Sequence, residues 1–91
     1  MDLKNLTENC KAGGSQWALD VYNETEATKR AAVKWGAGDV GDGALVTAQT
    51  VVTEAGAKWA DVPEANRGAL VDAVLAGAAR EWTVLRATEA G

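Results

Sequence analysis

DVPEANRGALVDAVLAGAAREWTVLRAT, residues 61–88, carries the clearest helical pattern in the chain. Asp61 is placed to accept a hydrogen bond from the amide of Glu64, and Pro63 lies in the first turn, where its missing N–H is tolerated. Apolar side chains then recur at spacings of three and four residues: Val71, Leu75, Ala78, Trp82 and Leu85. We therefore expect a helix over residues 62–88 with one apolar face.

Two glycines lie inside this predicted helix. Gly68 and Gly77 each weaken it by about 1 kcal/mol relative to alanine. Glycines of this kind are often kept where another helix crosses closely. We interpret both positions as candidate crossing points.

Residues 43–60 are expected to form the preceding helix. An apolar seam runs through them at spacings of three and four: Leu45, Ala48, Val52, Ala55 and Trp59. The alternative is a strand, because residues 46–53 are rich in β-branched valine and threonine. We favour the helix, since the stretch is too long for one strand and has no internal turn. A strand over residues 44–53 would change the fold class to α+β.

The glycine pair Gly13–Gly14 is predicted to separate two helices in the first part of the chain. The first, residues 2–12, is short and begins with Asp2 as a candidate N-cap. The second, residues 15–35, begins with Ser15 as its N-cap and ends at the next glycine.

Charge placement supports the second of these helices. Its acidic residues lie in the first half and its basic residues in the last turns, which suits the helix dipole. Glu26 and Arg30 are spaced for an i,i+4 ion pair.

Tryptophan supplies much of the bulk of the predicted core. Phenylalanine and isoleucine are absent, and alanine and valine dominate the apolar residues. One tryptophan is expected toward the end of each long helix: Trp35, Trp59 and Trp82. The indoles then fill the core of a domain whose close approaches come from alanine and glycine.

These segments together predict an all-α fold. A chain of 91 residues has room for one core, so residues 1–91 are expected to form a single domain. The architecture expected is a compact bundle of three main helices plus a short N-terminal helix. Short connections make consecutive helices antiparallel.

The charge balance argues against two classes of partner. The formal net charge is −4, and acidic and basic residues alternate along the chain. A mildly negative chain disfavours tight binding to the phosphates of nucleic acids and to anionic membranes. We therefore expect neither a nucleic acid nor a membrane as partner.

The cellular compartment is predicted from the cysteine count and the N-terminal sequence. Cys10 is the one cysteine, so no intramolecular disulfide can form, and we expect a buried or idle thiol in a reducing compartment. Residues 1–11 lack the basic region and apolar run of a signal peptide. The longest uncharged apolar stretch, residues 73–79, is too short to span a bilayer. We therefore expect a cytoplasmic protein.

Catalytic and cofactor chemistry are poorly supported. The chain has no histidine, so the usual proton shuttle near neutral pH and a partner for the Cys10 thiol are both missing. GAGDVG, residues 36–41, matches the dinucleotide-binding fingerprint, but a helix is expected where that motif needs a strand. Asp39 and Asp42 lack the companion ligands of a metal site. We expect no enzyme, no cofactor and no metal.

The glycine-rich loop at residues 36–43 is the best candidate for a contact surface. Trp35 flanks this loop, which gives it less cover, so among the four indoles it is the best candidate to face outward. Exposed tryptophan is a marker of interface hot spots. The loop also carries two aspartates, and the single tyrosine can lie on the same surface. The candidate partner-binding residues are Trp35, Asp39, Asp42 and Tyr22.

The leading functional hypothesis is a small non-enzymatic protein-interaction module that binds a host or partner protein. The lack of phenylalanine and isoleucine and the abundance of alanine, glycine and valine suggest a GC-rich genome, that of a bacterium or of a phage of one. An inhibitor of a host defence complex, encoded by a phage or mobile element, is one example of the class. The alternative is a structural, self-assembling subunit such as a virion component. In that case the partner is a second copy of the chain in a homo-oligomer.

Overall fold

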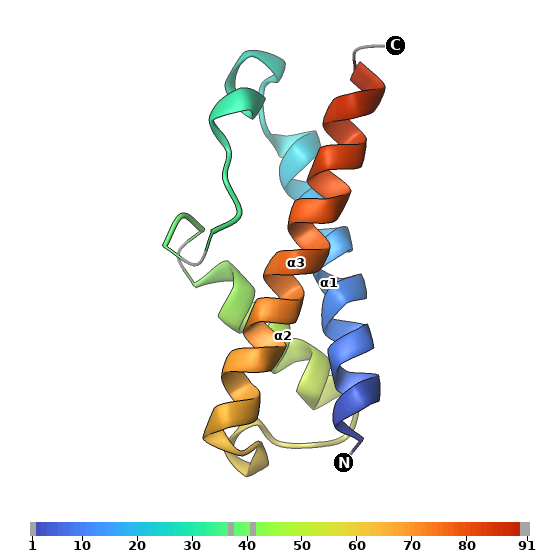
Figure 1. The fold of residues 1–91 in the computed structure, drawn as a ribbon, viewed down its shortest axis with the longest axis vertical. Coiled ribbons are helices and arrows are strands. Elements are labelled where there is room, and N and C mark those ends of the chain that lie inside the picture. Colours follow the sequence, from blue (N-terminus) through green and yellow to red (C-terminus); the bar gives the residue numbers. More distant parts are fainter. Residues whose placement is uncertain (1, 37, 41, 90–91) are drawn as a thin grey trace.

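The computed structural model describes residues 2–36, 38–40 and 42–89, and within them the protein is all-α, as predicted (Figure 1). The elements are α1 (Leu3–Glu24), the 3₁₀ helix η1 (Ala27–Ala32), α2 (Gly43–Glu54), the 3₁₀ helix η2 (Trp59–Asp61) and α3 (Glu64–Glu89). Residues 44–53 are entirely helical, so the α+β alternative is wrong.

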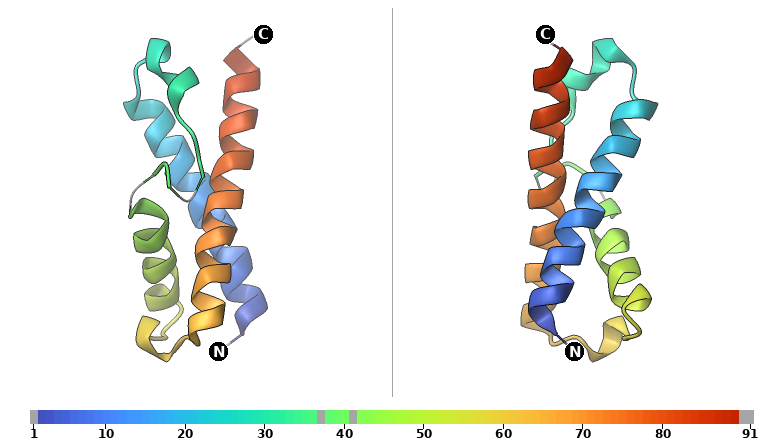
Figure 2. Two further views of the ribbon diagram at one scale, coloured as in Figure 1. Left: turned by 60° about the vertical axis from the view of Figure 1, so that its left-hand side comes forward. Right: turned by 90° about the vertical axis from the view of Figure 1, so that its right-hand side faces the viewer.

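The three α-helices run up, down and up along the 43 Å long axis of the molecule (Figures 1 and 2). Consecutive helices are antiparallel, which makes α1 and α3 parallel neighbours. α2 has 12 residues, whereas α1 has 22 and α3 has 26, so α2 covers only the half of the α1–α3 pair nearer the N-terminus. The described parts of the connecting segment between α1 and α2, residues 25–36, 38–40 and 42, lie along the other half.

α1 does not break at its glycine pair, so the predicted helices 2–12 and 15–35 are wrong in their boundaries. The helix begins as expected, with the Asp2 carboxylate accepting from the amides of Lys4 and Asn5. It continues through the pair because each glycine faces a neighbouring helix. Gly13 faces α2, and Gly14 lies against the main chain of α3.

α1 ends at Glu24, eleven residues before the predicted end at Trp35. Thr25 is extended, and both its amide and its hydroxyl donate to the Val21 carbonyl, at 2.9 and 2.6 Å. These bonds satisfy a carbonyl left open at the helix end. The chain then reverses through η1, and this reversal allows Trp35 to return to the α1–α3 pair.

α2 is shorter than predicted because Gly56 ends it. The predicted helix covered residues 43–60, but Gly56 adopts φ +84°, a left-handed conformation that favours glycine. The Gly56 amide donates to Thr53 O and the Ala57 amide donates to Val52 O, the two bonds of a Schellman motif. The sequence signal was present in Gly56 and was missed.

The buried face of α2 also differs from the predicted seam. Ala48 and Val52 are buried as expected, but Ala44 completes the face, whereas Leu45 is 38% exposed. The threonines adapt to the helix by back-bonding, since the hydroxyls of Thr47, Thr50 and Thr53 each donate to the carbonyl four residues earlier.

α3 matches its predicted range closely, but its start is built differently. The Asp61 side chain belongs to η2 and makes no hydrogen bond to Glu64 within the described residues. Instead, the Arg67 guanidinium donates from Nε to Val62 O at 2.8 Å and from Nη2 to Ala60 O at 3.0 Å. Arg67 thus satisfies the carbonyls of the turn that precedes the helix.

The tryptophans do not close the helices as predicted. Trp35 lies in an extended segment beyond η1, Trp59 begins η2, and Trp82 lies inside α3. Trp82 is buried, and the other three, including Trp17 of α1, are partly buried. The prediction rested on helix ends at positions 35 and 60, and both helices end earlier.

The core has two parts. Where all three helices meet, its largest fully buried side chains are Leu70, Val52, Val62, Val74 and Cys10. Beyond the N-terminus of α2, a second cluster forms around Ala18, Ala78 and Trp82, and aromatic side chains pack against it. Indoles therefore supply the bulk where the bundle has no third helix.

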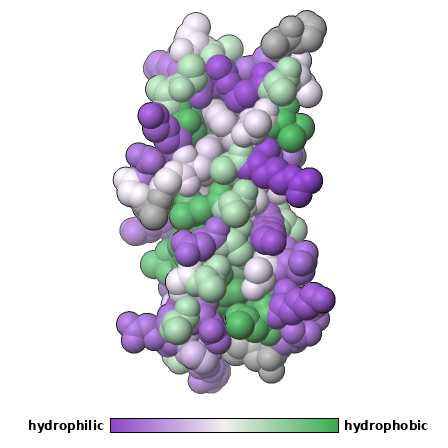
Figure 3. Space-filling view, in the orientation of Figure 1, coloured by the Kyte–Doolittle hydropathy of each residue, from purple (hydrophilic) through white to green (hydrophobic). Residues whose placement is uncertain are grey.

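The surface carries dispersed apolar residues. Figure 3 shows one face, with hydrophilic residues along both edges and hydrophobic residues in a band between them. The large apolar residues that are most exposed are Leu3, Leu45, Val46 and Val84. None of the helices in the described part of the chain is long and apolar enough to cross a membrane.

Candidate functional site

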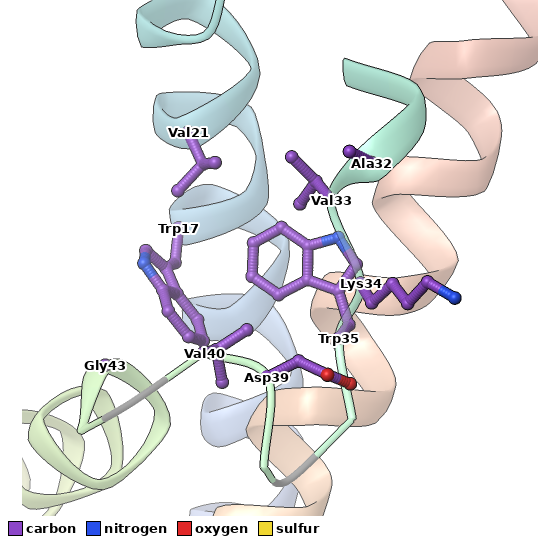
Figure 4. A pocket seen from close by; sticks show the side chains of 9 residues that line it. All are labelled: Trp17, Val21, Ala32, Val33, Lys34, Trp35, Asp39, Val40 and Gly43. Carbon is purple, nitrogen blue, oxygen red and sulfur yellow. The ribbon is translucent and has the colours of Figure 1, made fainter. Parts of the chain in front are cut away.

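A hollow with a volume of about 510 Å³ lies between α1 and the connecting segment (Figure 4). We call it the indole pocket, because two tryptophans form its walls. Its lining residues are Trp17, Val21, Ala32, Val33, Lys34, Trp35, Asp39, Val40 and Gly43.

Trp35 is the centre of this pocket. Val33 is extended, which carries the chain from η1 back across the α1–α3 pair and brings Trp35 between two other indoles. Its ring centroid lies 4.9 Å from that of Trp17, at 86°, and 5.5 Å from that of Trp82, at 59°. Edge-to-face contacts at this separation are favourable for aromatic rings. Trp35 therefore packs between Trp17 and Trp82 and is partly buried, whereas the sequence made it the best candidate among the indoles to face outward.

The position of Trp35 leaves one polar atom unsatisfied. Its Nε1 is buried and has no hydrogen-bond partner within the described residues. A buried donor without an acceptor costs about 1–3 kcal/mol. The packing of the indole between Trp17 and Trp82 has to offset this cost.

Trp17 is fixed by the first turn of α2. A β-carbon at Gly43 would overlap its six-membered ring, so this glycine lets the helix end lie directly against the indole. In Figure 4 the edge of the Trp35 ring points toward the Trp17 indole. The two rings form a corner that opens into the pocket.

The rim of the pocket carries opposite charges from the connecting segment. Asp39 lies in a turn closed by its amide donating to Gly36 O at 3.0 Å, and one of its carboxylate oxygens lies beside the Gly36 α-carbon. The Lys34 side chain extends away from the corner made by the two indoles (Figure 4). Lys34 and Asp39 are both exposed.

The structure brings together two of the four predicted site residues. Trp35 and Asp39 both line the indole pocket. Asp42 is the N-cap residue of α2 and is exposed, but its side chain makes no capping hydrogen bond and does not line the pocket. Tyr22 lies elsewhere, against Trp82, with ring centroids 5.6 Å apart.

Sequence reasoning missed most of the lining. Trp17 and Val21 have the i,i+4 spacing of a buried helical stripe, and this spacing does not distinguish the wall of a pocket from the core. Val33, Lys34 and Val40 have no distinguishing sequence signal. Their positions depend on the chain reversal after Thr25.

Tyr22 takes part in a cluster that joins the connecting segment to α1 and α3. The Arg30 guanidinium lies 3.7 Å from the Tyr22 ring centroid and donates to Tyr22 O, at 3.0 and 3.2 Å. Glu89 accepts from Arg30 at 2.9 Å and from the Tyr22 hydroxyl at 2.6 Å. Arg86 forms an ion pair with the same carboxylate at 2.9 Å. We call these four residues the latch.

The latch changes the acidity of two of its members. The hydrogen bond from Tyr22 lowers the pKa of Glu89, and the neighbouring arginines lower it further. The same hydrogen bond raises the pKa of Tyr22. The predicted ion pair between Glu26 and Arg30 is wrong, because Arg30 pairs with Glu89 while Glu26 approaches Lys29 at 3.6 Å.

The glycine-rich loop does not have the context of a dinucleotide site. A 3₁₀ helix and an extended segment precede Gly36, where the fingerprint needs a β-strand. Gly41, the last glycine of the match, lies outside the described residues. Over the same described residues, no group of three histidine, cysteine, aspartate or glutamate side chains is arranged to hold a metal ion.

Comparison with known proteins gives no relative. No family model matches the chain, and neither a curated protein nor a solved structure is significantly similar to it. The argument for function therefore depends on the indole pocket and its surroundings.

Proposed function

We propose that this protein is a non-enzymatic interaction module that binds a partner protein through the indole pocket. The observation that carries the proposal is the open corner formed by Trp17 and Trp35, which lines a hollow of about 510 Å³. Partly exposed tryptophans in a concave site are typical anchors of protein interfaces.

The architecture explains why the pocket lies there. α2 begins only at Gly43 and runs toward the N-terminal half of the α1–α3 pair, so the connecting segment lies along the other half in place of a helix. An irregular segment cannot fill the groove as completely as a helix can. The remaining space is bounded by Trp17 and Val21 of α1 on one side and by residues 32–35, 39 and 40 of the connecting segment on the other.

The proposed partner is a cytoplasmic protein of the host cell. An inhibitor of a host defence complex, encoded by a phage or mobile element, is one member of this class. Such proteins act by occupying a surface, so they need an anchoring site and no catalytic groups. The indole pocket supplies an anchoring site of this kind.

Affinity capture from a lysate of the source cell tests the proposal. The baits are the wild-type chain and two single variants that change the pocket. Trp17→Ala removes one wall of the pocket, and Val40→Arg fills it. Val84→Ser is the matched control, because Val84 is 51% exposed on α3 and does not line the pocket. Circular dichroism establishes that each variant is folded.

We expect wild type and Val84→Ser to capture the same stoichiometric partner and both pocket variants to lose it. Truncating a hot-spot residue costs about 2 kcal/mol or more, which lowers affinity at least tenfold. Absence of a stoichiometric partner, or equal capture by all four proteins, would contradict the proposal. Sedimentation at several concentrations distinguishes a foreign partner from a second copy of the chain.

A further inference from the structure

We infer that the indole pocket receives an arginine side chain of the partner, an inference that rests on the proposed function. Three features support it: the arrangement of the two indoles, the carboxylates around Trp17, and the aliphatic side chains beside the pocket. The features come from different elements of the fold.

The indoles offer aromatic faces to a cation. Trp17 and Trp35 are nearly perpendicular, at 86°, and both line the hollow. A guanidinium group stacks on one such face while its edge stays near the other ring. Tryptophan is the strongest cation–π partner among the aromatic side chains.

The surroundings of Trp17 carry an excess of negative charge. Asp39 lines the indole pocket, and Asp20 and Glu54 line the adjoining hollow, which shares Trp17 as a wall. Lys34 is the opposing positive charge in these two linings. Three carboxylates against one ammonium group favour a cationic occupant, as does the net charge of −4.

The shape of the pocket favours arginine over lysine. Val21 and Val33 lie beside the indoles and provide an apolar path for the aliphatic part of a long side chain (Figure 4). Guanidinium is planar and weakly hydrated, so it loses less on leaving water than the compact ammonium of lysine. A purely apolar side chain would gain nothing from the Asp39 carboxylate at the rim of the pocket.

The latch shows the same combination of groups within this molecule. The guanidinium of Arg30 lies over the ring of Tyr22 and bonds the carboxylate of Glu89. The indole pocket has the aromatic faces and the carboxylates but no arginine among its lining residues. The inferred partner side chain supplies this missing group.

The test is a peptide titration followed by NMR of the four indole N–H signals, assigned with single tryptophan-to-phenylalanine variants. The probes are the peptide acetyl-Gly-Arg-Gly-amide and its citrulline counterpart, which has the same shape without the charge. Trp59 is the internal control, because it lies in η2 and does not line the pocket. Asp39→Asn tests the contribution of the nearest carboxylate.

We expect the arginine peptide to shift the Trp17 and Trp35 signals and to leave Trp59 unchanged. A cation–π contact at a partly exposed site corresponds to about a two- to fivefold preference over citrulline. Asp39→Asn is expected to weaken binding of the arginine peptide and to leave binding of the citrulline peptide unchanged. Raising the salt concentration should weaken binding of the arginine peptide only.

Three results would overturn the inference: equal binding of the two peptides, equal shifts at Trp59, or no shift up to about 10 mM peptide. The proposed function is judged separately by affinity capture. Capture that Trp17→Ala abolishes, combined with no shift by the arginine peptide, would retain the proposed function and reject only the arginine assignment.

Discussion

Gly77 of α3 packs directly against the main chain of Lys11 in α1, so closely that a β-carbon at position 77 would overlap the Lys11 carbonyl group. Gly14 of α1 makes the reciprocal contact with the carbonyl of Val74 in α3. The Ser15 hydroxyl adds a hydrogen bond to Gly77 O at 3.3 Å. The two parallel helices therefore meet main chain to main chain.

Replacing Gly77 by alanine is expected to destabilise the protein. The obstacle is main chain and cannot rotate away, so the helices must separate, at a cost of roughly 1–3 kcal/mol or more. The gain in helix propensity from alanine, about 1 kcal/mol, offsets only part of this. Urea denaturation followed by circular dichroism measures the difference.

Gly68→Ala is the matched control for this prediction. Gly68 lies in the same helix, but a β-carbon there meets nothing within 4 Å. This substitution should therefore stabilise the protein by about 0.5–1 kcal/mol through helix propensity alone. Equal effects of the two substitutions would contradict the close crossing at Gly77.

The glycines show what sequence patterns can and cannot determine. The crossing at Gly77 was predicted from a glycine inside a strong helical pattern, and the structure confirms it, whereas Gly68 is open. Gly13 and Gly14 were interpreted as a helix end, because local conformational freedom is their commonest use. Their actual roles depend on distant helices, since Gly13 faces α2 and Gly14 lies against α3, which begins fifty residues later in the chain.

The candidate site was predictable only in part, for a similar reason. Trp35 and Asp39 were identified from their position beside a flexible loop. The pairing of Trp35 with Trp17 depends on the chain reversal after Thr25 and on the position of Gly43, where α2 begins against the Trp17 indole. The reversal is not encoded by a glycine or proline, and a periodic pattern of apolar residues continued across it.

The pKa of Glu89 is expected to lie below its ordinary range in the folded protein and to rise in Tyr22→Phe, which removes the hydrogen bond that lowers it most. Because the pKa of Glu89 is lowered by folding, this group stabilises the folded protein at pH values above the ordinary pKa range of glutamate. This stabilisation is lost as the pH falls below the ordinary glutamate range and through the lowered folded-state pKa. NMR titration of the side-chain carboxyl carbon measures both values.

Glu64→Gln provides the comparison for the pH dependence of stability. Glu64 lies at the other end of α3 and is exposed. Glu89→Gln should flatten the loss of stability on acidification, and Glu64→Gln should leave it close to that of wild type. Identical acid profiles for wild type and Glu89→Gln would show that the latch does not contribute.

Trp35→Phe is expected to cost less stability than Trp82→Phe. Phenylalanine removes the buried N–H of Trp35, which has no acceptor and costs about 1–3 kcal/mol of stability. The recovery of part of this cost offsets the loss of contact area. Trp82 is buried and contacts the rings of both Trp35 and Tyr22. We expect a loss of under about 1 kcal/mol for Trp35→Phe and roughly 1–3 kcal/mol for Trp82→Phe.

Chemical denaturation of the two variants under the same conditions gives this comparison. Trp82→Leu serves as a second substitution, since it tests whether the loss follows the missing volume. A larger loss for Trp35→Phe than for Trp82→Phe would mean that the Trp35 N–H finds an acceptor in solution.

Cys10 is fully buried on α1, and burial raises the pKa of its thiol, so we expect it to resist modification in the folded protein. A double variant, Cys10→Ala with Ala12→Cys, moves the thiol to an exposed position on the same helix. Reaction with a disulfide reagent at about pH 8 should be fast for the double variant and slow for wild type. In urea both should react at similar rates.

Because modification requires opening, Gly77→Ala should accelerate the reaction of Cys10 about tenfold for each 1.4 kcal/mol of stability lost. Equal reaction rates of the two thiols in the folded proteins would contradict the position of Cys10 in the core.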